Sequence, residues 1–321
     1  MMAATAWGQQ SLEAAFRSTG SAVTAAFENQ RAVLQTSSAV IMDGRDESGY
    51  GVVISPEGHI LTKASEFLAL EKPAIMVDRT KYPDVEVLAI DLEWDVVLVK
   101  IDAANLVPIV YAPTSDVSQG TWVVANGVTS RTKRRLLTGI VSAKTREIPA
   151  AGGPALGIVL KSGADELVID EVNKKSGAHE AGLQKDDVIL AIAGKTVSSI
   201  QELAEALKER RAGTTVEVTL RRGDEKLTFE VRLTAKSELF TEQMNRNDQM
   251  SGDFSSRRSG FPRVLQHDIL GSSKIVGGPL LDLDGRCLGM NIARANRAES
   301  FAIPVEDLKA LAERLMSQAA Q

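Results

Sequence analysis

Disulfides, long apolar runs and an excess of basic charge are all missing from this 321-residue sequence. Its single cysteine, Cys287, excludes an internal disulfide framework and, set in an apolar strand, is predicted to be a packed thiol. No run approaches the roughly 18 apolar residues of a membrane-spanning helix. The formal net charge of −5 lacks the basic footprint of nucleic-acid-binding domains. No nucleic-acid partner and no membrane span are therefore predicted.

The remaining composition is that of a folded protein with room for two domains. An apolar content of 44% with 25% charged residues argues against disorder. Two basic clusters, at residues 131–135 and 257–258, are not interleaved with aromatic residues and are predicted to be solvated loops. Residues 1–7 show neither the basic start nor the apolar stretch of an intact signal peptide.

Short strands dominate the first half of the chain. Residues 9–29 predict one or two short helices interrupted at Gly20, within an N-terminal helical segment of residues 1–30. An apolar strand, a Pro-Glu-Gly turn and a second apolar strand make a hairpin of residues 51–62. Further strands are predicted at 32–35, 39–42, 74–77, 85–90, 96–101, 122–125 and 137–143. Short strands at regular spacing with few helices indicate a β-barrel or sandwich.

The pattern changes around residue 155. Residues 155–234 predict a compact α+β module, in which a helix over 200–210 starts after the capping pair Ser198–Ser199. Strands of this module are predicted at 156–160, 167–169, 187–192, 215–221 and 226–233. Residues 235–260 are polar and predict a loop or linker. Strands are predicted again at 261–266 and 300–304, and a final helix at 305–316.

Residues 271–285 hold the most informative stretch of the chain. A tight turn of Gly277, Gly278 and Pro279 leads into an apolar strand, and an Asp-Gly turn leads into the next one. The residue in front of the glycine pair is Val276. This hairpin resembles the serine region of HtrA-type trypsin-like proteases. Other segments resemble the same protease domain in the family's order: 51–62, 91–102, 138–143, 266–268 and 301–304.

The resemblance implies a mainly β fold, a trypsin-like double β-barrel with an inserted α+β PDZ-like domain. The protease-like domain is then discontinuous, comprising residues 31–147 and 261–321, and residues 155–234 form the PDZ-like domain. Residues 155–158 resemble the carboxylate-binding loop of PDZ domains, and residues 176–189 resemble their Ala-Gly-Leu turn. An insertion of this kind is permissible because both of its ends leave one surface loop.

The catalytic positions of the family are degenerate in this sequence. A serine protease needs a nucleophile, a base that takes its proton and an acid that orients the base. The resemblance places Ser65 at the histidine position, Asp95 at the aspartate position and Val276 at the nucleophile position. Lys274 stands where the family has an oxyanion glycine. Because an isopropyl group cannot attack a carbonyl, the sequence predicts a catalytically inactive pseudoprotease.

Two other interpretations of the site stay open. An active serine endopeptidase would need a relocated nucleophile and base, for which serines and lysines on the same loops are candidates: Ser65, Ser272 and Ser273 with Lys63 or Lys274. His267, next to Asp268, is a further candidate base. A structural subunit that assembles with active HtrA-like paralogues is the other interpretation, since domains of this type commonly form trimers. No spacing predicts a metal site, and no cofactor is predicted.

Binding is predicted for the PDZ-like module. Successive N–H groups of its loop would hold a C-terminal carboxylate, and an extended peptide would add as a strand beside it. The helix that starts at Ile200 would form the other wall. The predicted peptide-binding residues are Leu156, Gly157, Ile158, Val159, Ile200, Ala204 and Leu207. The prediction is a scaffold, regulatory or chaperone-like protein, as a homo-oligomer or with HtrA-like partners, and the resemblance implies a periplasmic or secreted location.

Overall fold

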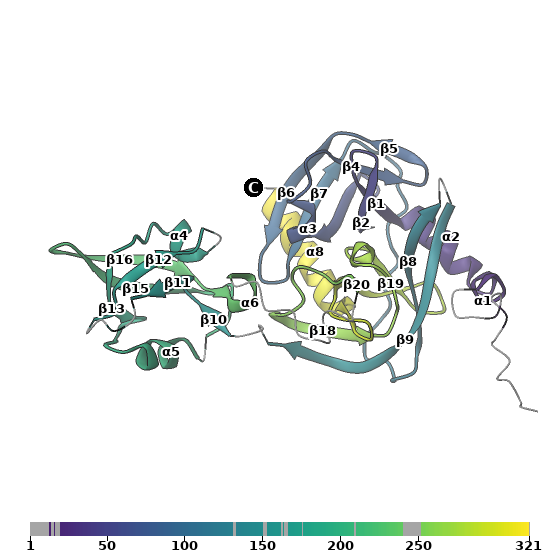
Figure 1. The fold of residues 1–321 in the computed structure, drawn as a ribbon. Helices are drawn as coiled ribbons and strands as arrows, with labels where there is room; N and C mark the ends of the chain where they lie inside the picture. Colours follow the sequence, from purple (N-terminus) through teal and green to yellow (C-terminus); the bar gives the residue numbers. More distant parts are fainter. Residues whose placement is uncertain are drawn as a thin grey trace, which may run out of the picture.

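Three β-rich parts make up the fold (Figure 1). The computed structural model describes Glu13, Phe16 and residues 20–130, 133–149, 153–161, 163, 166–174, 176–208, 210–239 and 252–320. Within these residues lie a seven-stranded sheet, a closed six-stranded barrel, and an α+β module inserted between two barrel strands. This mainly β arrangement of a half-barrel, a closed barrel and a third module confirms the predicted fold class.

The N-terminal segment is helical further along the chain than predicted. Helix α1 spans Ser21–Ala25 and helix α2 spans Glu28–Ser37, so the predicted strand at 32–35 is wrong. The buried residues of α2 are Gln30, Leu34 and Ser37. Their spacing of four and then three residues marks one face of a helix, whereas a half-buried strand would bury every second residue. Most of the predicted helical segment before residue 20 lies outside the described residues.

The seven-stranded sheet forms the half-barrel. Its strands are β1 Ser38–Asp43, β2 Asp46–Val53, β3 His59–Lys63, β4 Pro73–Val77, β5 Thr80–Tyr82, β6 Val85–Asp91 and β7 Val96–Ile101, in the spatial order β5-β4-β1-β2-β3-β7-β6. In β7, Val97 and Val99 join one buried cluster while Val96 and Leu98 join the other, as strand alternation requires. The short helix α3, Ala64–Phe67, follows β3 directly.

Six strands close the second barrel. They are β8 Trp122–Ser130, β9 Lys133–Ile148, β18 Phe261–His267, β19 Pro279–Leu281, β20 Cys287–Arg294 and β21 Ser300–Pro304. Because β9 pairs with β18, the chain segments before and after the inserted module meet in one barrel. The 3-10 turn η2, Ser273–Ile275, precedes β19. The C-terminal helix α8, Val305–Ala319, packs Leu308, Leu311 and Leu315 into the large core.

The inserted module has a core of its own. Its elements are β10 Pro154–Ala155, β11 Ile158–Leu160, β12 Ile169–Val172, α4 Gly177–Glu180, β13 Val188–Ile192, β14 Lys195–Thr196, α5 Ile200–Lys208, β15 Thr215–Arg222, β16 Glu225–Arg232, β17 Thr234–Ala235 and α6 Lys236–Leu239. Helix α5 starts as predicted, with the Glu202 N–H donating to Ser199 Oγ at 3.2 Å. The predicted strand 156–160 is split, because Gly157 takes a φ of +87°.

Three arginines of the two basic clusters, Arg134, Arg257 and Arg258, are anchored rather than solvated. Arg134 is only 2% exposed; its guanidinium lies 5.2 Å from the Tyr50 ring and donates to Asn126 Oδ1 at 3.1 Å. Arg258 donates to the Ala295 carbonyl at 2.9 Å, and Arg257 is bonded to several carbonyls described below. The prediction of solvated loops is therefore wrong at these residues. Carbonyl, amide and aromatic partners that are distant in sequence make the burial of each guanidinium tolerable.

Candidate functional site

Asp95 caps a short helix instead of orienting a catalytic base. Its carboxylate is buried and accepts the Ser65 backbone N–H on Oδ1 at 2.7 Å and the Ser65 hydroxyl on Oδ2 at 2.9 Å. Ser65 lies in the first turn of α3, where orphan N–H groups need an acceptor. The structure therefore brings together the two residues predicted for the base and acid positions. The serine proton is directed at a carboxylate that is a weak base.

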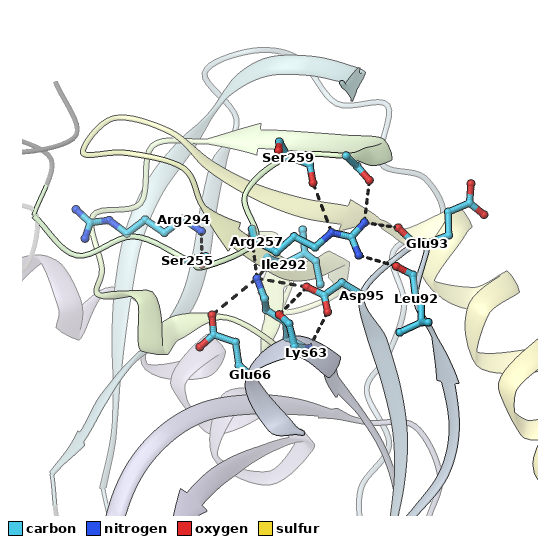
Figure 2. A network of polar contacts seen from close by, with 12 residues as sticks. Lys63, Glu66, Leu92, Glu93, Asp95, Ser255, Arg257, Ser259, Ile292 and Arg294 are labelled. Carbon is cyan, nitrogen blue, oxygen red and sulfur yellow. Dashed lines mark hydrogen bonds and ion pairs between the residues drawn. The ribbon is translucent and has the colours of Figure 1, made fainter. Parts of the chain in front are cut away.

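Lys63 is a buried ammonium beside this pair (Figure 2). Its Nζ donates to the Arg257 carbonyl at 2.8 Å and to the Ile292 carbonyl at 3.0 Å, and it lies 3.5 Å from Asp95 Oδ2. An ammonium has three N–H donors, so two carbonyls and one carboxylate satisfy all of them. Burial lowers the pKa of Lys63, and the nearby Asp95 and Glu66 carboxylates oppose that shift. The candidate partner of a serine nucleophile is thus held as a structural cation.

The segment of residues 252–260 is fastened across this site. The Arg257 guanidinium donates to the carbonyls of Leu92 at 2.6 Å and Glu93 at 2.7 Å (Figure 2). It also lies 4.9 Å from the centre of the Phe261 ring. Ser255 is fully buried and exchanges hydrogen bonds with the Arg294 backbone. These contacts join the segment to both β-sheets. Arg257 could not be identified as a site residue from the sequence, because its acceptors are main-chain carbonyls.

The loop at the nucleophile position is apolar and already hydrogen-bonded. Val276 is 2% exposed, and its carbonyl accepts the Tyr50 N–H at 2.9 Å. Gly277 follows with a φ of +83°, where a Cβ would meet the Tyr50 carbonyl oxygen at 2.1 Å. The Lys274 N–H, which the sequence predicts at an oxyanion-donor position, donates to Ser272 Oγ at 3.3 Å. This N–H is therefore occupied within its own 3-10 turn.

The candidate base His267 is not poised for proton transfer. His267 is fully buried; its Nε2 lies 2.8 Å from Asn291 Oδ1, and its Nδ1 accepts the Ile269 N–H at 3.3 Å. These two partners select the neutral imidazole with the proton on Nε2. Burial lowers the pKa of His267 to about 4. Ser272 accepts the Lys274 N–H, and the Ser273 side chain lies outside the described residues.

A hollow of about 540 Å³ lies between the Ser65–Asp95 pair and the inserted module. Ser65, Asp95 and Arg257 line it on the barrel side. Gly213 and Leu233 line it on the side of the module. The hollow therefore lies where the inserted module faces Ser65 and Asp95.

A second hollow, of about 590 Å³, lies between β11 and α5. Six of the seven predicted peptide-binding residues line it: Leu156, Gly157, Ile158, Ile200, Ala204 and Leu207. Val159 does not, and it is 43% exposed, because neighbouring side chains of a strand point to opposite faces. Leu160, Leu203, Lys208 and Lys236 also line this groove and were missed. Helical spacing from Ile200 to Leu207 through Leu203 was the signal for one of them.

The carbonyls of the predicted carboxylate-binding loop are tied to the body of the module. The Leu156 carbonyl accepts the Ala178 N–H at 3.2 Å, and the Gly157 carbonyl accepts the Asn173 N–H at 2.8 Å. In a trans peptide the N–H points opposite to the carbonyl, so the N–H groups of Gly157 and Ile158 point away from these donors. A Cβ at Gly157 would lie 2.0 Å from the Ser176 Cβ, so this loop requires glycine.

A closed barrel beside a half-barrel, with a PDZ module carrying a groove between a strand and a helix, defines a trypsin-like fold. Two family models match the chain: a trypsin-like peptidase domain over residues 49–168 and a PDZ domain over residues 154–233. The chain therefore contains a trypsin-like peptidase domain and a PDZ domain, and HtrA- and DegP-type serine proteases are among the proteins that it resembles.

The curated relatives that match this chain are serine proteases. Serine protease HTRA1 of Xenopus tropicalis is 24% identical over 276 residues, which cover 57% of this chain and 59% of the relative. A probable periplasmic serine endoprotease DegP-like of Halomonas elongata is 29% identical over 105 residues, which cover 33% of this chain and 22% of the relative. The chain thus spans between about a fifth and three fifths of these relatives. The solved serine endoprotease from Yersinia pestis aligns with a TM-score of 0.34 and 18% identity, covering 64% of this chain and 97% of that one.

No helix among the described residues is long and apolar enough to cross a membrane.

Proposed function

We propose that this protein is a catalytically inactive HtrA-like pseudoprotease that binds peptides or partner proteins through its PDZ groove, in a scaffold, regulatory or chaperone-like role. One observation carries the proposal: a buried valine, Val276, stands at the nucleophile position. Loss of the nucleophile or of the base alone costs on the order of a millionfold in turnover in a serine protease. Here the histidine position holds Ser65, whose hydroxyl donates to Asp95.

The bonding around the site supports inactivity beyond the loss of two residues. Lys63 has its three donors directed at two carbonyls and a carboxylate, so it has no free electron pair with which to accept a serine proton. An oxyanion hole needs N–H donors aimed at the reacting carbonyl. The Lys274 N–H is instead bonded to Ser272 Oγ. Base, nucleophile and one oxyanion donor are therefore all absent or engaged.

The groove of the PDZ domain supports the binding role. The N–H groups of Gly157 and Ile158 point toward the open side of the loop, where they would receive a carboxylate. An extended peptide added along β11 would place alternate side chains against Leu203 and Leu207 of α5. About 590 Å³ of hollow is enough space for several such side chains.

A Val276→Ser variant is expected to show neither labelling by a fluorophosphonate probe nor cleavage of casein. The new hydroxyl would have no base to accept its proton, because the histidine position is Ser65. Trypsin treated in parallel controls for probe reactivity, and the wild-type chain should give the same blank result. Time-dependent labelling of the wild-type protein would refute the assignment as a pseudoprotease, and mass spectrometry of the labelled peptide would locate the nucleophile.

An Ala204→Arg variant is expected to weaken peptide binding by at least about tenfold, since an arginine there would fill the groove. Ala204 is exposed, so the change should leave the melting temperature almost unaltered. Gln201→Arg is the matched control, because Gln201 is also exposed on α5 but does not line the groove. Affinities for hits from a C-terminal peptide array would be measured by fluorescence anisotropy. Equal loss in both variants would argue against this groove as the binding site.

We also propose a division of the chain into a discontinuous protease-like domain, residues 31–147 and 261–321, and a PDZ-like domain, residues 155–234. The pairing of β9 with β18 and the separate apolar core of the module support it. Residues 1–30 would form the N-terminal helical segment and residues 235–260 the linker. Limited proteolysis that releases one stable fragment close to residues 155–234 would support this division.

A location outside the cytoplasm is part of the proposal. Relatives from Halomonas elongata and Escherichia coli are named as periplasmic proteases. Association with itself or with HtrA-like proteins is the corresponding proposal for partners, and mass measurement in solution, alone and mixed with such a protease, would test it.

A further inference from the structure

The carboxylate end of the PDZ groove opens into a second hollow. This hollow has a volume of about 310 Å³ and shares Gly153, Pro154 and Lys208 with the groove of about 590 Å³. Its other walls include Ile148 and Phe261 from the barrel strands β9 and β18. A peptide end held at the Leu156–Gly157 loop would therefore face a further space rather than a closed wall.

Four basic residues surround this junction. Lys208 and Lys236 line the groove, and Lys208, Arg210 and Arg211 line the adjoining hollow; we call these four residues the basic rim. All four are exposed. The backbone N–H of Lys236 donates to the Gly153 carbonyl at 3.1 Å, which fixes Lys236 beside the residues shared by the two hollows.

Acidic residues near the basic rim do not neutralise it. Lys208 lies 3.8 Å from Glu205, with both side chains more than 70% exposed, and Arg211 lies 3.4 Å from Glu147, with exposed fractions of 62% and 47%. Exposed pairs of this kind contribute little stability, because solvent screens them. They break readily when a better-placed carboxylate arrives. Glu93 and Glu147 line the smaller hollow and Glu205 lines the groove, so four basic residues face three acidic ones and the junction keeps a small excess of positive charge.

We propose that the groove selects acidic C-terminal tails: an apolar side chain packs between β11 and α5, and an Asp or Glu within the last two residues pairs with the basic rim. This inference rests on the proposed peptide-binding function and names its ligand class. The chain-end carboxylate binds the loop N–H groups, and the added acidic side chain meets Lys208 or Lys236. Complementary charge of this kind sets both selectivity and association rate.

Three fluorescent decapeptides test the proposal on the full-length chain. They share one apolar anchor residue and carry two aspartates, two serines or two lysines near the free carboxylate. At about 50 mM salt the acidic tail is expected to bind about tenfold more tightly than the lysine tail, and the difference should shrink at about 300 mM salt as screening shortens the range of the charges. Equal affinities for the three tails would overturn the selectivity.

Charge reversal provides the second arm of the experiment. The double variant Lys208→Glu/Lys236→Glu is expected to invert the preference between acidic and lysine tails while changing the affinity for the serine tail less than about threefold. Lys226→Glu is the control, since Lys226 is exposed on β16 and lines neither hollow. If the double variant lowers the melting temperature and leaves the tail preference unchanged, the lysines stabilise the fold, as a cation at the C-terminal end of α5 would, and the proposal fails.

Failure of the ligand class and failure of the binding function give different results. If the serine tail binds and Ala204→Arg abolishes that binding, the groove is a peptide site whatever the charge preference. If no tail binds to the wild-type chain, both the acidic-tail proposal and the peptide-binding function are overturned.

Discussion

A Lys63→Ala variant is expected to lose about 3–5 kcal/mol of unfolding free energy. The change removes a buried ammonium that lies 3.5 Å from Asp95 and donates to two main-chain carbonyls. Asp95 would stay buried with only the two Ser65 donors, and the carbonyls of Arg257 and Ile292 would lose their partner. Uncompensated buried charge and unsatisfied acceptors add to the cost of the cavity itself.

Two companion variants separate charge from volume at this position. Lys63→Met keeps most of the volume, so its cost measures the lost charge and hydrogen bonds. Adding Asp95→Asn to Lys63→Met removes the carboxylate that has lost its cation. The double variant is expected to recover part of the lost stability, because replacing both members of a buried ion pair costs less than removing one and leaving the other charged. A double-mutant cycle gives the coupling energy.

Tryptophan fluorescence makes the measurement specific to the barrels. Trp94 and Trp122 lie in the protease-like part, and residues 155–234 contain no tryptophan. Urea unfolding followed by tryptophan fluorescence therefore reports the unfolding of the barrels separately from that of the PDZ domain. A Lys63→Ala variant within about 1 kcal/mol of the wild type would contradict the role of the ammonium as a structural cation.

The second large effect is a loss of stability in mild acid caused by His267. Its folded-state pKa is about 4, against an ordinary value of 6.5, because burial penalises the imidazolium. Between these two values the unfolded chain binds a proton that the folded chain excludes, so unfolding becomes easier as the pH falls from 6.5 to 4. At about 1.4 kcal/mol per pKa unit, the full effect is about 3 kcal/mol. Above pH 6.5 this contribution is constant.

A histidine-to-glutamine comparison isolates the effect. His267→Gln is expected to be less stable than the wild type at pH 7, since it cannot reproduce the bonds to Asn291 and Ile269 together, but its stability should fall less between pH 6.5 and 4. His179→Gln, a change at an exposed histidine of the PDZ domain, is the control and should keep the wild-type profile. Parallel profiles for the His267 variant and the wild type would contradict the assignment.

Much of the fold follows from local patterns. The hairpin of residues 51–62, the module strands β13, β15 and β16 and the C-terminal helix were predictable because alternation and helical spacing are properties of neighbouring residues. The predicted strand at 167–169 was misplaced, since the observed strand β12 is Ile169–Val172. The six groove residues share a hollow for the same reason, since the spacing of Ile200, Ala204 and Leu207 puts them on one face of α5. A short apolar run does not distinguish a helix from a strand, and residues 32–35, predicted as a strand, are helical.

The hydrogen bonds around Lys63 could not be predicted from the sequence. Lys63 has its partners at residues 95, 257 and 292, which approach one another only when the half-barrel, the closed barrel and the 252–260 segment are all in place. Two of these partners are main-chain carbonyls, which every residue type has, and the third is a carboxylate shared with Ser65. No residue type in the sequence therefore indicates these contacts. A lysine in an unaligned sequence is most often exposed, and burial at 1% exposure depends entirely on this long-range assembly.

The pairing of β9 with β18 sets an order of events on the ribosome. All core residues of the PDZ module lie between Leu156 and Leu233, so the module can fold as soon as it has left the exit tunnel. Residues 261–304, which supply four of the six barrel strands, are translated afterwards. During that interval the 16-residue strand β9 has no barrel partner on its β18 edge. The barrel therefore closes only after the PDZ module has been synthesised, and the length of the insertion sets how long the pairing of β9 with β18 is delayed.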